Sequence, residues 1–290
     1  MREDSMRRAW LAAALAVAVV GTTACGGDDG EGAPQLLSVE LRSSGGGAFE
    51  IVGGGPVEAG LVQLEYENAT EEQADAQLLR MDGDHTVADA LEVIGSESGV
   101  TPDWLHAEGG AGQIAAGATG VAELVLEEGT YYLVDVGEPE GDDVPSHAES
   151  GATMTLEVSG GDDGAELPAA DASIQMADYN FVTEGLRAGA NRFLLTNTGK
   201  EIHHTLMVPI QGDATIGEVR EFLLSEGPPT GAPPVSFEKL TGTSALDGGG
   251  EQIQELELEA GRWAFLCFIT DRAGGPPHVA KGMVREVTIE

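Results

Sequence analysis

The chain has 290 residues, of which 14 are Lys or Arg and 50 are Asp or Glu, so its formal net charge is −36 at pH 7. A surface of this charge repels nucleic acid and anionic lipid headgroups, which excludes both as ligands of that surface. The length suits two domains of ordinary size better than one small sandwich.

The first 24 residues have the pattern of a secretion signal. Arg7 and Arg8 precede an apolar run of about eleven residues, which is too short to cross a bilayer as a helix. The small residues Thr-Thr-Ala stand directly before Cys25, an arrangement that resembles a bacterial lipobox, in which the cysteine carries the lipid. We therefore expect an extracytoplasmic protein that Cys25 anchors to the cell membrane, on the cell surface or the periplasmic face.

The body of the chain contains an internal repeat. Residues 68–86 (NATEEQADAQLLRMDGDHT) align without gaps on residues 197–215 (NTGKEIHHTLMVPIQGDAT). Each stretch ends on a threonine with an acidic residue three positions later, a capping box that predicts a short helix in each half. Near the ends of the halves, residues 124–136 parallel residues 256–268, and each of the two stretches is typical of two strands joined by a Gly turn.

Many short strands at regular spacing, separated by Gly-rich turns, predict an all-β fold. We expect two tandem Greek-key β-sandwich domains, each with a short helix insertion. The expected signal peptide, flexible tether, first domain, linker and second domain lie at residues 1–24, 25–34, 35–158, 159–171 and 172–290.

The second half carries a set of side chains that can bind a metal. The chain has two cysteines, and if Cys25 is lipidated, Cys267 is a lone thiol in an exported protein. Such a thiol is free and reactive, forms an intermolecular bond, or ligates a metal. Thiolate, imidazole and thioether groups, the donors of a mononuclear blue-copper site, follow in the order His203, His204, Cys267, His278 and Met283.

In this order of residue types, residues 172–290 resemble a cupredoxin, and residues 35–158 resemble one more weakly. The resemblance implies a Greek-key sandwich with one type 1-like copper ion at one end, used for one-electron transfer. It implies that Cys267 supplies the thiolate, His278 one imidazole and Met283 a weak axial ligand. The first imidazole is His203 or His204, and the sequence does not choose between them. Ten residues separate Cys267 from His278, more than in most small cupredoxins, and the Gly-Gly-Pro-Pro run before His278 could turn the chain back.

The first half serves as an internal comparison. Ala74-Asp75 stand where the second half has His203-His204, Asp135 stands where it has Cys267, and Ala152 where it has Met283. Only His147 matches, opposite His278. We therefore expect no copper site in the first domain.

The sequence favours a membrane-anchored, extracytoplasmic protein that binds one copper ion in its C-terminal domain, for electron transfer or copper handling, with a redox or copper-exchange protein as partner. The alternative is a metal-free cupredoxin-like scaffold that binds a protein or another ligand. We expect no enzymatic activity, because the six histidines include no His-x-His pair for a second, all-histidine copper centre.

Overall fold

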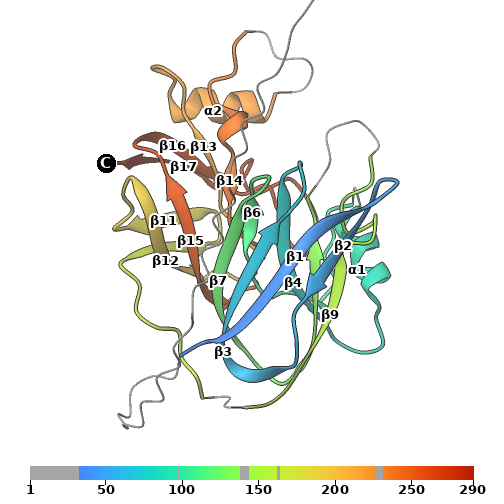
Figure 1. Cartoon of the computed structure of the whole chain (residues 1–290). Helices are drawn as coiled ribbons and strands as arrows, with labels where there is room; N and C mark the ends of the chain where they lie inside the picture. The colour runs from blue at the N-terminus through green and yellow to red at the C-terminus, as the bar shows by residue number, and fades with distance from the viewer. Residues whose placement is uncertain (1–32, 97, 138–143, 162–163, 226–230) are drawn as a thin grey trace, which may run out of the picture. The chain divides into compact units, whose positions relative to one another are not determined.

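The computed structural model describes residues 33–96, 98–137, 144–161, 164–225 and 231–290 (Figure 1). The expected signal peptide, Cys25 and nearly all of the tether lie outside the described residues. Within the described ranges, no helix has both the length and the apolar character needed to cross a membrane.

The first half of the chain consists of nine strands and one short helix among its described residues. In chain order these are β1 (Gln35–Gly45), β2 (Ala48–Gly53), β3 (Val57–Asn68), β4 (Ala74–Met81), α1 (Val87–Ile94), β5 (Leu105–Ala107), β6 (Gly112–Ile114), β7 (Thr119–Leu126), β8 (Gly129–Asp135) and β9 (Thr153–Gly161).

The described residues of the second half repeat this composition of strands with one α-helix. They form β10 (Ala172–Ala177), β11 (Asn180–Glu184), β12 (Gly189–Asn197), β13 (Leu206–Pro209), α2 (Ile216–Leu223), the 3-10 turn η1 (Phe237–Lys239), β14 (Thr241–Gly242), β15 (Glu251–Leu258), β16 (Gly261–Leu266) and β17 (Val284–Ile289). The predicted all-β fold with a short helix in each half is confirmed.

Both helices begin at the predicted capping boxes. Thr86 Oγ1 accepts from the Asp89 N–H, and the Asp89 carboxylate accepts from the Thr86 N–H in return. Thr215 and Glu218 exchange the same two bonds at α2. Each box satisfies N–H groups that the first helical turn leaves without partners, so eight-residue helices can begin sharply.

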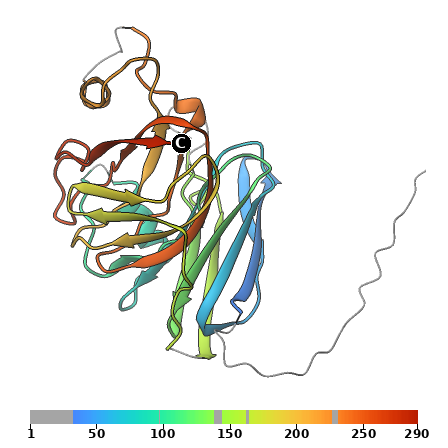
Figure 2. The ribbon, with the colours of Figure 1, turned by 90° about the vertical axis from the view of Figure 1, so that its left-hand side faces the viewer.

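The strands of the second half form two layers around one apolar core. β13, β14, β16 and β17 form one sheet, and β10, β11, β12 and β15 belong to a larger one. Side chains that alternate along the strands, such as Phe193 on β12 and Phe265 on β16, are fully buried in the same cluster. In the first half, Leu64 on β3 and Leu133 on β8 occupy a separate core of the same kind. In Figure 2 the blue strands of the first half lie on the right and the yellow and red strands of the second half on the left.

One sheet runs through both halves. β7 pairs antiparallel with β15, so that Glu123 lies opposite Ile253 and thirteen strands belong to a single sheet among the described residues (Figure 1). An ion pair at 2.7 Å between Arg192 and Glu123 adds a contact beside this joint. The halves belong to one compact unit, and the division at residues 35–158 and 172–290 stays a prediction. β9 continues to Gly161, three residues into the expected linker, because Ala59 of β3 pairs with Gly161.

Buried polar groups also join the halves. Gln252 Oε1 accepts from the Gly110 N–H at 2.8 Å, and Gln252 Nε2 donates to the Gly110 carbonyl at 3.0 Å. Gln77 makes the reciprocal pair of bonds with the backbone of Ala245. Each amide side chain thus satisfies backbone groups of the opposite half that would be costly to bury alone.

We expect Gly110→Ala to destabilise the protein, because Gly110 lies close to the backbone of β4. Gly110 has φ +139°, and a Cβ atom there would lie 2.4 Å from the Ala76 carbonyl oxygen, so the backbones of the two segments would have to separate. Gly261 has a similar φ of +144° with no atom within 4 Å of its Cβ position, which makes Gly261→Ala the matched control for backbone strain. Urea denaturation should give Gly110→Ala a free energy of unfolding about 2 kcal/mol lower than that of Gly261→Ala. Equal values for the two variants would contradict the close packing at Gly110.

Candidate metal centre

Backbone hydrogen bonds fix the loop that carries three of the predicted ligands. Cys267 follows β16 directly, and Val279 N–H donates to its carbonyl at 2.8 Å. Met283, just before β17, donates to the His278 carbonyl at 2.9 Å, and its own carbonyl accepts from the Cys267 N–H at 3.3 Å. The three residues are therefore held by main-chain bonds, independently of what their side chains bind.

The long segment between Cys267 and His278 folds back on itself. Gly274 N–H donates to the Asp271 carbonyl at 2.7 Å, and His278 N–H donates to the Ile269 carbonyl at 2.8 Å. Gly274 and Gly275 have φ of +81° and +116°, values that favour glycine. The Gly-rich turn returns His278 to the cysteine despite the ten intervening residues.

His203 enters from the other side of the site. It lies in the connection between β12 and β13, where its N–H and carbonyl exchange hydrogen bonds with Leu246 at 3.1 and 2.9 Å. The next residue, Asp247, donates its N–H to the Ala107 carbonyl at 2.9 Å. The first half therefore supports the backbone that positions His203.

Three donor atoms converge at one buried point. Nδ1 of His203 lies 3.0 Å from Nδ1 of His278, and the Cys267 sulfur lies 3.9 and 3.5 Å from these two nitrogens. All three residues have no solvent-exposed surface. Within the described part of the chain, these three are the group of His, Cys, Asp or Glu side chains whose ligand atoms lie close enough together to hold a metal ion.

The spacing of these atoms fits a small cation. The point equidistant from all three lies about 2 Å from each, close to metal–nitrogen bonds of about 2.0–2.1 Å and metal–sulfur bonds of about 2.3 Å in zinc proteins. Two imidazoles and one thiolate in a trigonal arrangement are the ligand set that blue-copper sites use. The donor set therefore suits copper.

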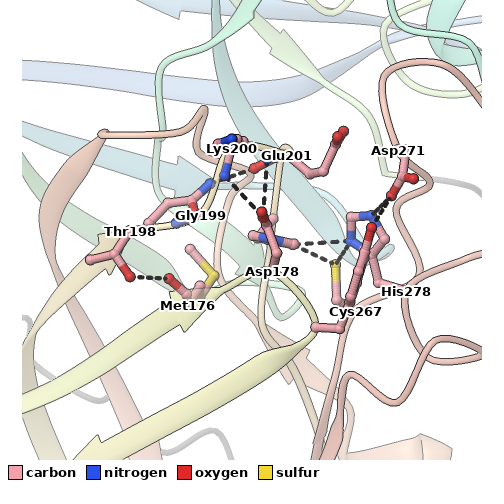
Figure 3. A network of polar contacts seen from close by, with 12 residues as sticks. Met176, Asp178, Thr198, Gly199, Lys200, Glu201, Cys267, Asp271 and His278 are labelled. Carbon is pink, nitrogen blue, oxygen red and sulfur yellow. Dashed lines mark hydrogen bonds and ion pairs between the residues drawn. The ribbon is translucent and has the colours of Figure 1, made fainter.

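Carboxylates hold both imidazoles from behind. Nε2 of His203 lies 3.2 Å from Asp178 Oδ1, and Nε2 of His278 lies 3.1 Å from Asp271 Oδ1 (Figure 3). When each Nε2 donates its hydrogen to the carboxylate, both Nδ1 lone pairs point at the same site. Two lone pairs 3.0 Å apart repel, and a cation between them would stabilise the arrangement.

The two carboxylates are themselves fixed. Asp178 Oδ1 accepts from the Lys200 N–H at 2.9 Å and from the Glu201 N–H at 3.2 Å (Figure 3). Asp271 accepts from the Tyr179 hydroxyl at 2.9 Å and forms an ion pair with Lys281. The Lys281 ammonium lowers the pKa of the Asp271 carboxyl.

Burial sets the protonation of the ligands without metal. It lowers the pKa of His278 to about 4, with a further contribution from the neighbouring His203, and it also lowers the pKa of His203 itself. It raises the pKa of the Cys267 thiol to about 12, which backbone contacts offset only in part. At neutral pH the imidazoles are neutral and ready to ligate, whereas a metal would have to displace the thiol proton.

Two of the five predicted ligands, His204 and Met283, are not part of the three-atom cluster. His204 lies outside the three-atom cluster, and its Nε2 accepts from the Phe268 N–H at 3.0 Å. Met283 is fully buried in the apolar cluster that also contains Cys267. Of the two candidate histidines, His203 is therefore the one at the site, and binding of a metal by these residues stays a prediction.

Asp178 and Asp271 were not identified from the sequence. Asp271 lies inside the Cys–His loop, where an acidic residue among Gly and Arg gives a weak signal. Asp178 belongs to the turn between β10 and β11, far from the other residues in sequence. Its neighbour Tyr179 has a φ of 67°, which is strained for a non-glycine residue. Only the pairing of β10 with β12 brings this turn to the site.

The equivalent loop in the first half has the same backbone bonds but other side chains. Ala148 N–H donates to the Asp135 carbonyl at 2.7 Å, Ala152 to the His147 carbonyl at 2.8 Å, and Asp135 to the Ala152 carbonyl at 3.0 Å. These bonds place Asp135, His147 and Ala152 at the positions of Cys267, His278 and Met283, as the alignment predicts.

In the first half, His147 and Asp135 form a hydrogen bond at the positions that His278 and Cys267 occupy in the second half. Nδ1 of His147 lies 2.9 Å from Asp135 Oδ1, its Nε2 lies 3.0 Å from Glu72, and the Tyr66 hydroxyl donates to Asp135 Oδ2 at 2.7 Å. Burial by itself lowers the pKa of His147, but the hydrogen bonds and charges of Asp135 and Glu72 more than offset it, so the pKa is raised.

The raised pKa of His147 predicts a pH-dependent stability. Protonated His147 binds its carboxylates only in the folded protein, so its contribution is fully present below the unfolded pKa of about 6.5. That contribution is lost as the pH rises through the higher folded pKa. Urea denaturation should therefore give a larger difference in unfolding free energy between the wild type and His147→Gln at pH 5.5 than at pH 9. A difference that is constant, or larger at pH 9, would show that the His147 charge does not stabilise the fold.

No protein-family model matches the chain, and no curated protein sequence matches it. Among solved structures, auracyanin A from Chloroflexus aurantiacus, described as a "blue" copper protein, is 18% identical, covers 42% of this chain with 98% of its own, and has a TM-score of 0.29. Copper nitrite reductase from Nitrosomonas europaea is 13% identical and covers 89% of this chain with 94% of its own, at a TM-score of 0.26. A multicopper oxidase is 14% identical over 89% of this chain and 88% of its own, with a TM-score of 0.25.

Copper proteins are thus among the structures that this chain resembles.

Proposed function

We propose that the chain is a cupredoxin-like protein that binds one copper ion through His203, Cys267 and His278 and transfers single electrons. The observation that carries the proposal is the convergence of two Nδ1 atoms and one sulfur on a single buried point. Met283, which main-chain bonds join to both Cys267 and His278, would be a fourth, weaker ligand. Bound copper would supply a one-electron couple.

The surroundings of the site favour electron transfer over copper exchange. Both imidazole rings are locked by carboxylates, and all three donor residues are excluded from water. A closed, preorganised site changes its geometry little on redox, whereas metal exchange requires the ligands to open. Phe268, directly after Cys267, is 39% exposed and would give the centre an apolar contact with a redox partner. Copper handling, with an exchange partner, is the second candidate.

We also propose that the protein works outside the cytoplasm, anchored through lipid on Cys25. This part of the proposal is supported by the lipobox-like sequence before Cys25. The membrane contact would then come from the lipid and not from the acidic surface. We propose electron transfer without enzymatic turnover. The proposal is supported by the histidines, which include no His-x-His pair for a second, all-histidine copper centre.

The copper proposal predicts a strong visible absorption. Adding Cu(II) to the full chain should produce an intense band from charge transfer between the Cys267 thiolate and the metal. Each sample carries Cys25→Ala, so that Cys267 is the single cysteine. Cys267→Ala should abolish the band and leave the circular dichroism of a folded β protein.

The internal repeat offers a matched control. His278→Gln should lose most of the band, whereas His147→Gln, at the equivalent position of the first half, should retain it. A band that survives Cys267→Ala would refute the proposed ligands. A folded wild-type protein that gives no band would refute the copper site and favour a metal-free binding scaffold.

A further inference from the structure

A cavity lies beside the candidate metal centre and is lined by residues of both halves. Its volume is about 400 Å³, in the range of sites that bind small molecules. Its walls are largely apolar, and the side chains of Leu79, Val93 and Ile202 contribute to them. Ile94 and Phe268, which also line it, are 45% and 39% exposed, so that apolar side chains reach from the cavity to the surface.

The cavity is built from equivalent segments of the two repeats. Asp75 and His204 both line it, and they occupy matching positions in the aligned stretches. Val136 and Phe268, which follow Asp135 and Cys267, form a second matching pair. The repeat therefore brings a carboxyl group from one half and an imidazole from the other to a common apolar space.

Other polar side chains of the lining already have partners inside the protein. Gln77 bonds to the backbone of Ala245, Thr270 donates to the Gly99 carbonyl, and the Thr243 hydroxyl accepts from the Thr205 N–H. These bonds stabilise the cavity wall and leave these groups little capacity for a ligand.

His204 offers a hydrogen-bond donor. Its Nε2 accepts from the Phe268 N–H, so the ring hydrogen is on Nδ1. Among the described residues no hydrogen bond of this Nδ1 is found, and the His204 side chain lines the cavity.

Asp75 offers the complementary group. Burial raises the pKa of its carboxyl to about 7, and the charge of Asp135 adds to the effect, while a hydrogen bond with Gln113 lowers it. Near neutral pH this group can accept or donate a hydrogen bond. An anionic ligand would be repelled by its ionised form, which favours a neutral molecule.

We propose that this cavity is a binding site for a small neutral aromatic alcohol of the phenol class, whose hydroxyl group bonds to Asp75 and to His204 Nδ1. A hydroxyl group both donates and accepts, which matches the carboxyl acceptor and the N–H donor. A six-membered ring would replace water along the apolar wall. The site does not require a metal, so the proposal stands independently of the copper centre.

The test is ¹⁹F NMR titration of the full chain, without added metal, with 4-fluorophenol and with 4-fluorotoluene. The wild type should bind 4-fluorophenol about tenfold more tightly than 4-fluorotoluene, because only the phenol makes the hydrogen bonds. Asp75→Leu should weaken 4-fluorophenol binding about tenfold and leave 4-fluorotoluene unchanged. Val93→Phe, which fills the apolar wall, should weaken the binding of both probes.

Asp84→Leu is the matched control, since Asp84 is exposed and does not line the cavity. It should leave the binding of both probes unchanged. Equal affinity of the wild type for the two probes, absence of binding by a folded protein, or no effect of Asp75→Leu would each overturn the proposal.

Discussion

The arrangement of the site depends on main-chain hydrogen bonds that connect Cys267, His278 and Met283 at the end of the last hairpin. These bonds fix the backbone positions of the three residues independently of any metal. His203 is added by its bonds to Leu246, which the first half supports through Asp247 and Ala107. Because the backbone carries the geometry, the buried side chains can meet with two carboxylates behind them, and little reorganisation is needed on binding a cation.

The two halves show how the same backbone supports different chemistry. In the first half, Asp135 stands at the cysteine position and His147 turns Nδ1 toward it, so the buried donor and acceptor satisfy each other. In the second half, Cys267 is a weak hydrogen-bonding group, and the Nδ1 atoms of both imidazoles lie close to its sulfur and to each other. Side-chain exchanges on a shared backbone, Asp135 for Cys267 and Ala74 for His203, thus separate a hydrogen-bonded pair from a candidate metal centre.

Periodicity and local motifs predicted the strands, both capping boxes and the positions of Cys267 and His278, because these signals lie within short segments. The choice of His203 over His204 could not be predicted, since it depends on how the connection after β12 bonds to Leu246. Asp178 was missed because strand pairing, which spans distant segments, brings its turn to the site. The β7–β15 joint was missed for the same reason. The predicted signal peptide and lipidated Cys25 concern residues outside those that the structure describes.

The most direct test of the central claim is a crystal structure of the copper-loaded protein with anomalous diffraction recorded at the copper edge. The account predicts one strong peak at the point equidistant from His203 Nδ1, His278 Nδ1 and the Cys267 sulfur, about 2 Å from each. It also predicts no peak between Asp135 and His147, because their side chains already bond to each other. A peak elsewhere, or a copper ion held by His204 in place of His203, would contradict the proposed site.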